Sequence, residues 1–233
     1  MPKFWRSQQR DQLKREIDTY THLPLHPRLI RMLSYNKDGD DTSLTLEYMP
    51  NGSLAAYLRN NAATVTAELR ARWALQAAQG VAMLHAHSVI HADLKPTNML
   101  LDKGLGLRIA DFSGCSLLGK PPYILESGPF YMPADWREHS ELPCNVTTDI
   151  FALGSCIFQI ATGKKPYEGL EDDDIEKKFA SWEFPGLEGI LFAEVIRKCW
   201  FSEFESAEAV LQALSMEVRD ILGDSEFPSK ALG

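Results

Sequence analysis

The sequence has little of what marks a secreted, membrane-spanning or nucleic-acid-binding protein. Its four cysteines, Cys115, Cys144, Cys156 and Cys199, are widely spaced and form no paired metal-ligand pattern, so we expect reduced thiols that fill the core. No apolar run reaches the length of a bilayer span, and residues 1–10 lack the apolar core of a signal peptide. The formal net charge of -8 disfavours nucleic acid and anionic membranes as partners, because both attract clustered Lys and Arg. We therefore expect an intracellular protein, cytoplasmic or nuclear.

What the sequence does have is the composition of a globular protein. Its 233 residues are 45% hydrophobic and 24% charged, as in ordinary soluble domains. A chain of this length can bury a sizeable core in one or two domains.

The most informative stretch is residues 89–113, which carries polar side chains on a predicted loop. Val89-Ile90 ends an apolar run, and Pro96 prevents a helix from continuing. The polar side chains on the resulting loop are those of Asp93, Lys95 and Asn98.

A hairpin is predicted directly after this loop. Residues 99–101 and 105–110 are strand-like, and the turn at 102–104 joins them. The returning strand would bring Asp111 beside Asn98, and together these residues offer the oxygen ligands that Mg²⁺ takes when it also holds phosphates.

The loop residues suit a transfer reaction at such a metal. Asp93 could accept a proton from an attacking hydroxyl, and Lys95 could neutralise charge on the transferred group. Taken singly, each polar residue here is explained as well by the turn preference of Asp and Asn or by the solvation of Lys. The four together, Asp93, Lys95, Asn98 and Asp111, favour the chemical interpretation.

Residues 91–98, His-Ala-Asp-Leu-Lys-Pro-Thr-Asn, resemble the catalytic loop of protein kinases, and residues 111–113, Asp-Phe-Ser, resemble their Asp-Phe-Gly metal motif. The resemblance implies that Asp93 is the catalytic base and that Lys95 contacts the γ-phosphate. It also implies that Asn98 and Asp111 hold Mg²⁺, that ATP is the phosphate donor, and that a protein Ser or Thr is the acceptor. A lysine at position 95 is similar to Ser/Thr kinases rather than tyrosine kinases.

Two positions depart from the family pattern. Ala92 replaces the usual Arg, which in the family reads a phosphate on the activation loop, so we expect that switch to be absent. Ser113 replaces Gly and removes some backbone freedom next to Asp111 without removing the ligand.

The first fifty residues resemble part of a kinase small lobe. An amphipathic helix is predicted over 10–23, followed by strand-like runs at 29–33 and 43–48. On this alignment Glu16 takes the place of the family's small-lobe helix glutamate, although a solvated helix face explains it as well. Residues 46–54 resemble the kinase hinge, which implies nucleotide contacts at Glu47 and Met49. The resemblance to the family also implies one at Leu100.

The rest of the chain resembles the helical large lobe of the family. A long helix is predicted over 66–87 with Thr66 as its cap, and the apolar run 150–160 predicts a deeply buried helix. Asp149 is predicted to cap that second helix; in kinases the matching Asp also holds the catalytic loop, and His91 is a second supporting residue. Two further helices are predicted at 191–200 and 206–222.

We therefore predict an α+β fold of the protein kinase type, with a small lobe reduced to one helix and a hairpin. The expected boundaries are 1–48 for the small-lobe remnant, 49–52 for the hinge, 53–222 for the large lobe and 223–233 for a loose tail. Residues 111–136 resemble an activation segment that ends near Asp135. The region after residue 184 resembles a group of small fungal protein kinases.

No G-x-G-x-x-G loop and no Val-Ala-Ile-Lys strand precede Glu16, and Lys3 is the only lysine before Lys14. Either upstream residues are missing from this gene product, or the protein lacks the first small-lobe strands. The leading hypothesis is a Ser/Thr protein kinase that uses MgATP. The alternative is a catalytically impaired, kinase-like module that binds scaffold partners. A small-molecule phosphotransferase of the antibiotic-kinase type ranks last.

Overall fold

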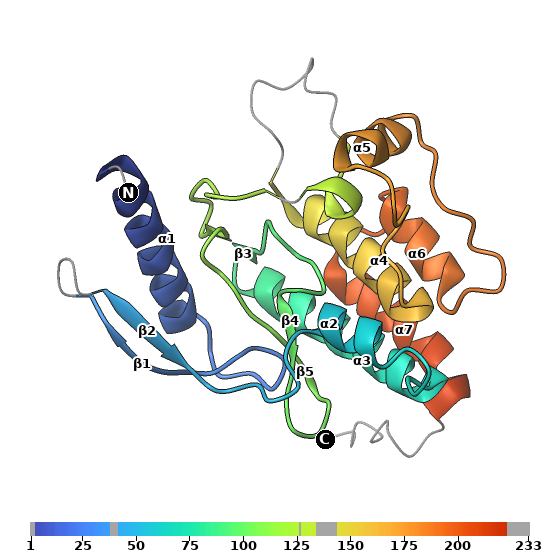
Figure 1. Cartoon of the computed structure of the whole chain (residues 1–233), viewed down its shortest axis with the longest axis horizontal. Coiled ribbons are helices and arrows are strands. Elements are labelled where there is room, and N and C mark those ends of the chain that lie inside the picture. Colours follow the sequence, from blue (N-terminus) through green and yellow to red (C-terminus); the bar gives the residue numbers. More distant parts are fainter. Residues whose placement is uncertain (1–2, 38–41, 126, 134–143, 223–233) are drawn as a thin grey trace.

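The structure, a computed structural model, describes residues 3–37, 42–125, 127–133 and 144–222. Figure 1 shows two parts side by side: helix α1 with the hairpin β1–β2, and a larger, mainly helical part. The first part comprises α1 (Lys3–His22), β1 (Met32–Asn36) and β2 (Ser43–Leu46).

Six helices and a 3-10 turn build the larger part within the described ranges. They are α2 (Leu54–Asn60), α3 (Ala67–Ala86), η1 (Gly128–Phe130), α4 (Val146–Thr162), α5 (Asp172–Ala180), α6 (Ala193–Trp200) and α7 (Ala207–Leu222). Two short antiparallel strand pairs lie against them: β3 (Val89–Ile90) with β6 (Ser116–Leu117), and β4 (Met99–Leu101) with β5 (Leu107–Ile109). This arrangement confirms the predicted α+β class with a small helix-and-hairpin half and a helical large half.

Helix α1 begins earlier than its apolar pattern indicated, at Lys3 rather than near residue 10. Its buried face includes Ile17 and Tyr20, as the helical spacing predicted. The helix ends just before Pro24, which cannot continue it.

The first strand of the hairpin lies three residues later than predicted. Strand β1 pairs with β2 from Met32 onward, with an irregularity before Ser34. The apolar pair Leu29-Ile30 is instead used elsewhere: Leu29 bridges Ile109, and the Ile30 amide donates to the Ile109 carbonyl at 3.0 Å. The prediction of a strand at 29–33 was therefore partly wrong, because the backbone at Leu29 and Ile30 anchors the small half to β5.

The buried centre of the large half is formed by α3 and α4. Helix α3 starts at the predicted cap, since the Thr66 side chain accepts a hydrogen bond from the Leu69 amide. Helix α4 is buried over most of its length, as its continuous apolar run predicted. Its N-cap, however, is Asn145, which forms a capping box with Thr148, and the prediction that Asp149 caps the helix was wrong.

No disulfide joins the four cysteines, as the sequence indicated. Cys115, Cys156 and Cys199 are buried, and burial raises the pKa of the Cys115 thiol to about 11. None of the helices within the described ranges combines the length and the apolar character needed to cross a membrane.

Candidate functional site: the loop between β3 and β4

The loop that carries Asp93 is fastened to α4 by one buried carboxylate. Asp149, which is fully buried, accepts hydrogen bonds from the amides of His91 at 2.7 Å and Ala92 at 3.0 Å. His85 at the end of α3 adds a third bond at 2.9 Å. Burial alone would raise the pKa of Asp149, but the hydrogen bond and charge of His85, with His91 and the Ala92 amide, outweigh it and lower the pKa.

Ala92 has a left-handed backbone, with φ of +64°, a conformation that costs energy for any residue with a Cβ. The side chain is fully buried. The bond from the Ala92 amide to Asp149 holds the loop in this shape. The family's Arg is thus replaced by a small residue at a tightly packed turn.

Asp93, Lys95 and Asn98 meet at the surface of this loop. The Lys95 ammonium donates to Asp93 Oδ1 at 2.7 Å, and the Asn98 amide donates to Asp93 Oδ2 at 3.1 Å and to its backbone carbonyl at 2.9 Å. The side chain of Asp93 is only 11% exposed, whereas that of Lys95 is 33% exposed. The carboxylate is therefore fixed in direction and yet reachable from one side.

The β4–β5 hairpin brings Asp111 back towards this loop, as the strand-like runs predicted. The Ala110 amide donates to the Asn98 carbonyl at 2.9 Å, so the two backbones touch one residue before Asp111. Asp111 is exposed and has φ of +65°. Its Oδ1 accepts a hydrogen bond from the Ser113 hydroxyl at 2.7 Å.

Ser113 thus has a contact that glycine, the family's residue, could not make. The sequence suggested that Ser113 would mainly restrict the backbone. In the structure the positive φ falls on Asp111 and not on Ser113, so the backbone at 113 needs no glycine. The hydroxyl instead fixes the direction of the neighbouring carboxylate.

Phe112 ties the two halves of the molecule together behind Asp111. Its ring is fully buried and makes edge contacts with Tyr20 of α1 at 5.0 Å and with His91 at 5.6 Å between ring centroids. His91 Nε2 also lies 3.1 Å from the Ala110 carbonyl. His91 therefore links the loop to the segment that leads into Asp111.

Glu16 on α1 points at the same segment and not into solvent. Burial and then the charge of Asp111 raise the pKa of Glu16 to about 7, while a hydrogen bond from the Phe112 amide partly opposes the shift. Among the residues that the structure describes, no Lys or Arg forms an ion pair with Glu16 or Asp111. The side chain of Lys3 lies outside the described part.

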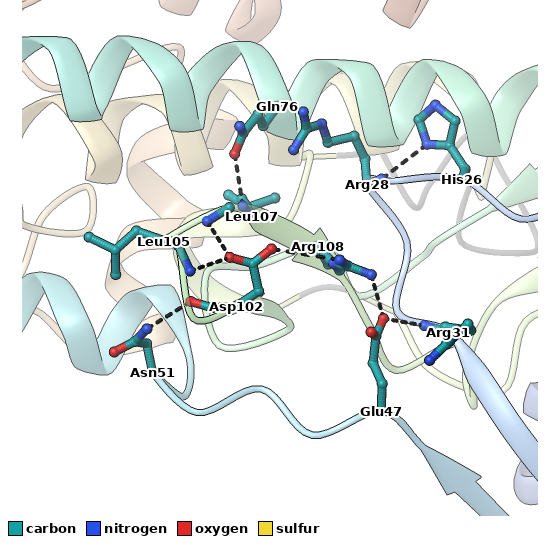
Figure 2. A network of polar contacts seen from close by, with 12 residues as sticks. His26, Arg28, Arg31, Glu47, Asn51, Gln76, Asp102, Leu105, Leu107 and Arg108 are labelled. Atoms are coloured by element: carbon teal, nitrogen blue, oxygen red, sulfur yellow. Dashed lines mark hydrogen bonds and ion pairs between the residues drawn. The ribbon is translucent and has the colours of Figure 1, made fainter.

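Glu47 makes structural contacts that the sequence did not reveal (Figure 2). Its carboxylate accepts from the Arg31 amide at 2.7 Å and from Arg108 of β5 at 2.6 Å. Arg108 also lies 3.6 Å from Asp102 in the β4–β5 turn. These contacts join the segment after β2 to the hairpin that carries the site.

The same network shows how the turn of that hairpin is built (Figure 2). Asp102 accepts from the amides of Gly104 and Gly106, and Gln76 of α3 accepts from the Leu107 amide at 2.8 Å. Asp102 at a turn followed by two glycines was a readable signal. The role of Gln76 could not be read from its position in a helical pattern.

The two other predicted nucleotide contacts lie on either side of the connection after β2. Met49 is 6% exposed and belongs to the core, and Leu100 is half-buried in β4 and bridges Ser53. Their contact with a nucleotide stays a prediction.

The donor set fits Mg²⁺ bound together with phosphates. Because the Asn98 amide nitrogen is directed to Asp93, the oxygen on the other arm of that planar group remains for a cation. The backbone contact between Asn98 and Ala110 brings the chain at Asp111 back towards Asn98. Among the described residues no three His, Cys, Asp or Glu side chains gather into a metal cluster. Mg²⁺ typically needs only one or two protein carboxylates when substrate phosphates complete its shell.

The predicted end of the activation segment, Asp135, lies outside the described residues. The part before it is held by α5: the Gly128 amide donates to Glu176 at 3.1 Å. Gly128 has φ of +53°, and a Cβ there would collide with Asp172. Glycine is therefore favoured where this segment crosses the start of α5.

Comparison with known proteins identifies the family of the chain. Residues 3–221 match the protein kinase domain family. The match spans nearly all of the chain, and the chain belongs to the protein kinase domain family.

Several curated Ser/Thr kinases are similar to the chain. A probable serine/threonine-protein kinase of Arabidopsis thaliana, PBL28, is 31% identical over 176 residues, which are 71% of this chain and 46% of the plant protein. Serine/threonine-protein kinase PLK4 of Nematostella vectensis is 30% identical over 66% of this chain and 16% of its own length. Serine/threonine-protein kinase PDK1 of Cryptococcus neoformans is 31% identical over 63% of this chain and 12% of its own length.

The chain spans less than half the length of each of these relatives. They come from a plant, an animal and a fungus, so the resemblance to small fungal kinases stays a prediction. The alignments support the family and leave the activity of this chain as a proposal.

Proposed function

We propose that the chain is a Ser/Thr protein kinase that transfers the γ-phosphate of MgATP to a hydroxyl of a protein. The observation that carries the proposal is the set of hydrogen bonds at the loop. The Asp93 carboxylate accepts hydrogen bonds from Lys95 and Asn98, and Asp111 lies one residue beyond the Asn98–Ala110 contact. Membership of the kinase domain family supports it.

In this proposal Asp93 accepts the proton of the acceptor hydroxyl as the hydroxyl attacks. The hydrogen bonds from Lys95 and Asn98 fix the orientation of the Asp93 carboxylate, and Lys95 also offers a positive charge to the transferred group. Asn98 and Asp111 would hold the metal, which when bound neutralises charge on the phosphates. Glu47 and Met49, which follow β2, and Leu100 in β4 would contact the nucleotide.

Replacing the base tests the assignment. Asp93→Asn keeps the size of the side chain but cannot accept a proton well, so phosphate transfer to a protein substrate should fall by roughly 10²–10⁴-fold. Transfer is measured with γ-labelled ATP at saturating Mg²⁺. Asp11→Asn, on the exposed face of α1, is the matched control and should keep full activity. Equal rates in wild type and Asp93→Asn would refute the role of Asp93.

A second function is favoured by one specific observation: among the described residues, no Lys or Arg forms an ion pair with the carboxylate of Glu16 or Asp111. Without a cation between them, a nucleotide phosphate would meet uncompensated negative charge, which suits a kinase-like binding module better than a fast enzyme. Such a module would act by binding scaffold partners through its surface.

A thermal titration with MgATP separates the two functions. Ligand at a hundredfold excess over Kd stabilises by about 2.7 kcal/mol, which for a domain of this size raises Tm by roughly 5 to 10 °C. We expect that rise for the kinase. An unchanged Tm at millimolar MgATP would support the binding module. The cytoplasmic or nuclear location inferred from the sequence stays a prediction.

A further inference from the structure

A groove of about 490 Å³ adjoins the loop that carries Asp93. Its walls come from α2, from loop residues 95–97 and from the end of α4 with the segment that follows it, 163–168. Lys95 lines the groove, and its ammonium lies 2.7 Å from the Asp93 carboxylate. The groove therefore begins at the proton acceptor of the proposed reaction.

The charged side chains of this groove are mostly positive. Four cations and one anion line it, namely Arg59, Lys95, Lys164, Lys165 and Glu168. The whole chain carries a formal charge of -8. The groove is thus a positive region on a negatively charged protein, which concentrates anionic ligands there.

The cations that flank the loop differ from those of the neighbouring helices in their partners. Among the described residues, no acidic side chain pairs with Arg59, Lys164 or Lys165. The cations of α5 and α6 behave differently: Lys177 pairs with its neighbour Asp174 at 2.8 Å, and the other basic side chains of these two helices also form ion pairs with acidic residues. Arg59 and Lys164 are exposed, so both can reach a ligand from opposite walls.

The floor between these cations is apolar. Leu58 and Phe130, which are 1% and 9% exposed, line it together with Ala55. A concave surface with an apolar floor and cationic walls fits a polypeptide segment, since side-chain stems can pack on the floor while their charged ends meet Lys and Arg.

We propose that this groove binds an anionic segment of the protein substrate, next to the hydroxyl that reaches Asp93. The inference rests on the proposed function, because it treats the groove as the continuation of the acceptor site. The anionic groups are either Asp and Glu carboxylates or the phosphate of a residue that has already been phosphorylated, because Lys and Arg bind both. The substrate class is thus a Ser or Thr in an acidic or phosphorylated context.

Phosphorylation of designed peptides tests the preference. Each peptide has one Ser, flanked by Glu, by phosphoserine, by Ala or by Lys. We expect kcat/KM for the Glu or the phosphoserine peptide to exceed that for the Ala peptide at least tenfold, and the Lys peptide to be the poorest. The charge reversals Arg59→Glu and Lys164→Glu should each lower kcat/KM for the anionic peptide at least fivefold. Lys103→Glu, an equal change of charge at the exposed β4–β5 turn, should lower it less than twofold.

A binding measurement separates this inference from the proposed function. Fluorescently labelled peptides with Ala in place of the acceptor Ser are titrated with wild type, Arg59→Glu and Lys164→Glu, and anisotropy gives Kd without turnover. If no peptide is phosphorylated but the Glu peptide binds and both reversals weaken it, the groove inference holds and the proposed function fails. If only the phosphoserine peptide binds, the source of the anion is a prior phosphorylation.

Two results overturn the inference. One is efficient phosphorylation of the Lys or Ala peptide with no gain from Glu or phosphoserine, which leaves the proposed function standing. The other is binding of anionic peptides that Arg59→Glu and Lys164→Glu leave unchanged, or no binding of any anionic peptide. The melting temperature of each variant, compared with that of Lys103→Glu, shows that a loss is not due to unfolding.

Discussion

The loop that carries Asp93 and the helix that carries Glu16 differ in how their buried charges are satisfied. At the loop, Asp149 accepts three hydrogen bonds and Asp93 accepts two from side chains. On α1, Glu16 lies largely buried beside Asp111, and no described Lys or Arg pairs with either carboxylate. The large half thus satisfies the carboxylates of the Asp93 loop by itself, whereas on the face towards α1 no cation among the described residues balances the charges of Glu16 and Asp111.

The largest effect on stability is expected from removing Asp149, the buried hydrogen-bond acceptor of the Asp93 loop. Asp149→Ala leaves two buried amides and His85 without their acceptor, and removing one member of a buried polar set costs about 3–5 kcal/mol. Urea denaturation measures the loss. Asp149→Asn, which keeps the shape and one acceptor oxygen, should fall between wild type and Asp149→Ala. A loss under about 1 kcal/mol for Asp149→Ala would contradict the account of the loop.

The opposite result is expected at Glu16, where neutralisation should stabilise the protein. Because the folded pKa is raised to about 7, the folded state binds a proton more tightly than the unfolded chain. Protonation of Glu16 therefore adds to the free energy of unfolding at low pH, and this contribution is lost as the pH rises through 7. The advantage of Glu16→Gln over wild type should therefore grow by on the order of 2 kcal/mol between pH 5 and pH 8.

Denaturation curves at several pH values test this prediction. Glu205→Gln, at an exposed residue, is the control and should follow wild type at every pH. Parallel stability curves for Glu16→Gln and wild type would show that Glu16 is solvated and not buried beside Asp111.

A smaller effect is expected where the two regions are joined by Glu47 and Arg108. The ion pair is partly exposed, with 25% of Arg108 and 18% of Glu47 accessible, so its coupling energy should be about 1 kcal/mol. A double-mutant cycle with Glu47→Gln and Arg108→Gln measures it. The coupling should shrink in 1 M salt, since screening weakens exposed pairs; a coupling of zero at low salt would remove this link from the account.

The smallest effect is expected at Ser113. Ser113→Ala removes one hydrogen bond to Asp111, and a loss of about 0.5 kcal/mol corresponds to a two- to threefold weaker MgATP affinity. Ser113→Thr keeps the hydroxyl and should bind as wild type does. Equal affinities for Ser113→Ala and wild type would show that the Asp111 carboxylate needs no support.

The sequence predicted the parts of the site that depend on neighbouring residues. Pro96 and the turn after Leu101 are local signals. They predicted the loop that carries Asp93 and the hairpin that leads to Asp111. Thr66 was identified as a cap because its effect acts within one helical turn. These features follow from short-range backbone chemistry.

The parts that were missed depend on contacts between distant residues. Asn145, and not the predicted Asp149, caps α4, and the acceptor role of Asp149 becomes visible only when the loop at His91 is placed beside it. The pairing of Glu47 with Arg108 and the burial of Glu16 against Asp111 join segments more than sixty residues apart. The short helix α2 was missed because seven residues carry little periodicity.

The most direct test of the central claim is calorimetric titration of ATP with and without Mg²⁺. If Asn98 and Asp111 hold the metal against the phosphates, Mg²⁺ should raise the affinity for ATP at least tenfold, about 1.4 kcal/mol. Asp111→Ala should abolish that gain and leave metal-free ATP binding no weaker. An ATP affinity that is the same with Mg²⁺ and with EDTA in the wild-type protein would contradict the claim.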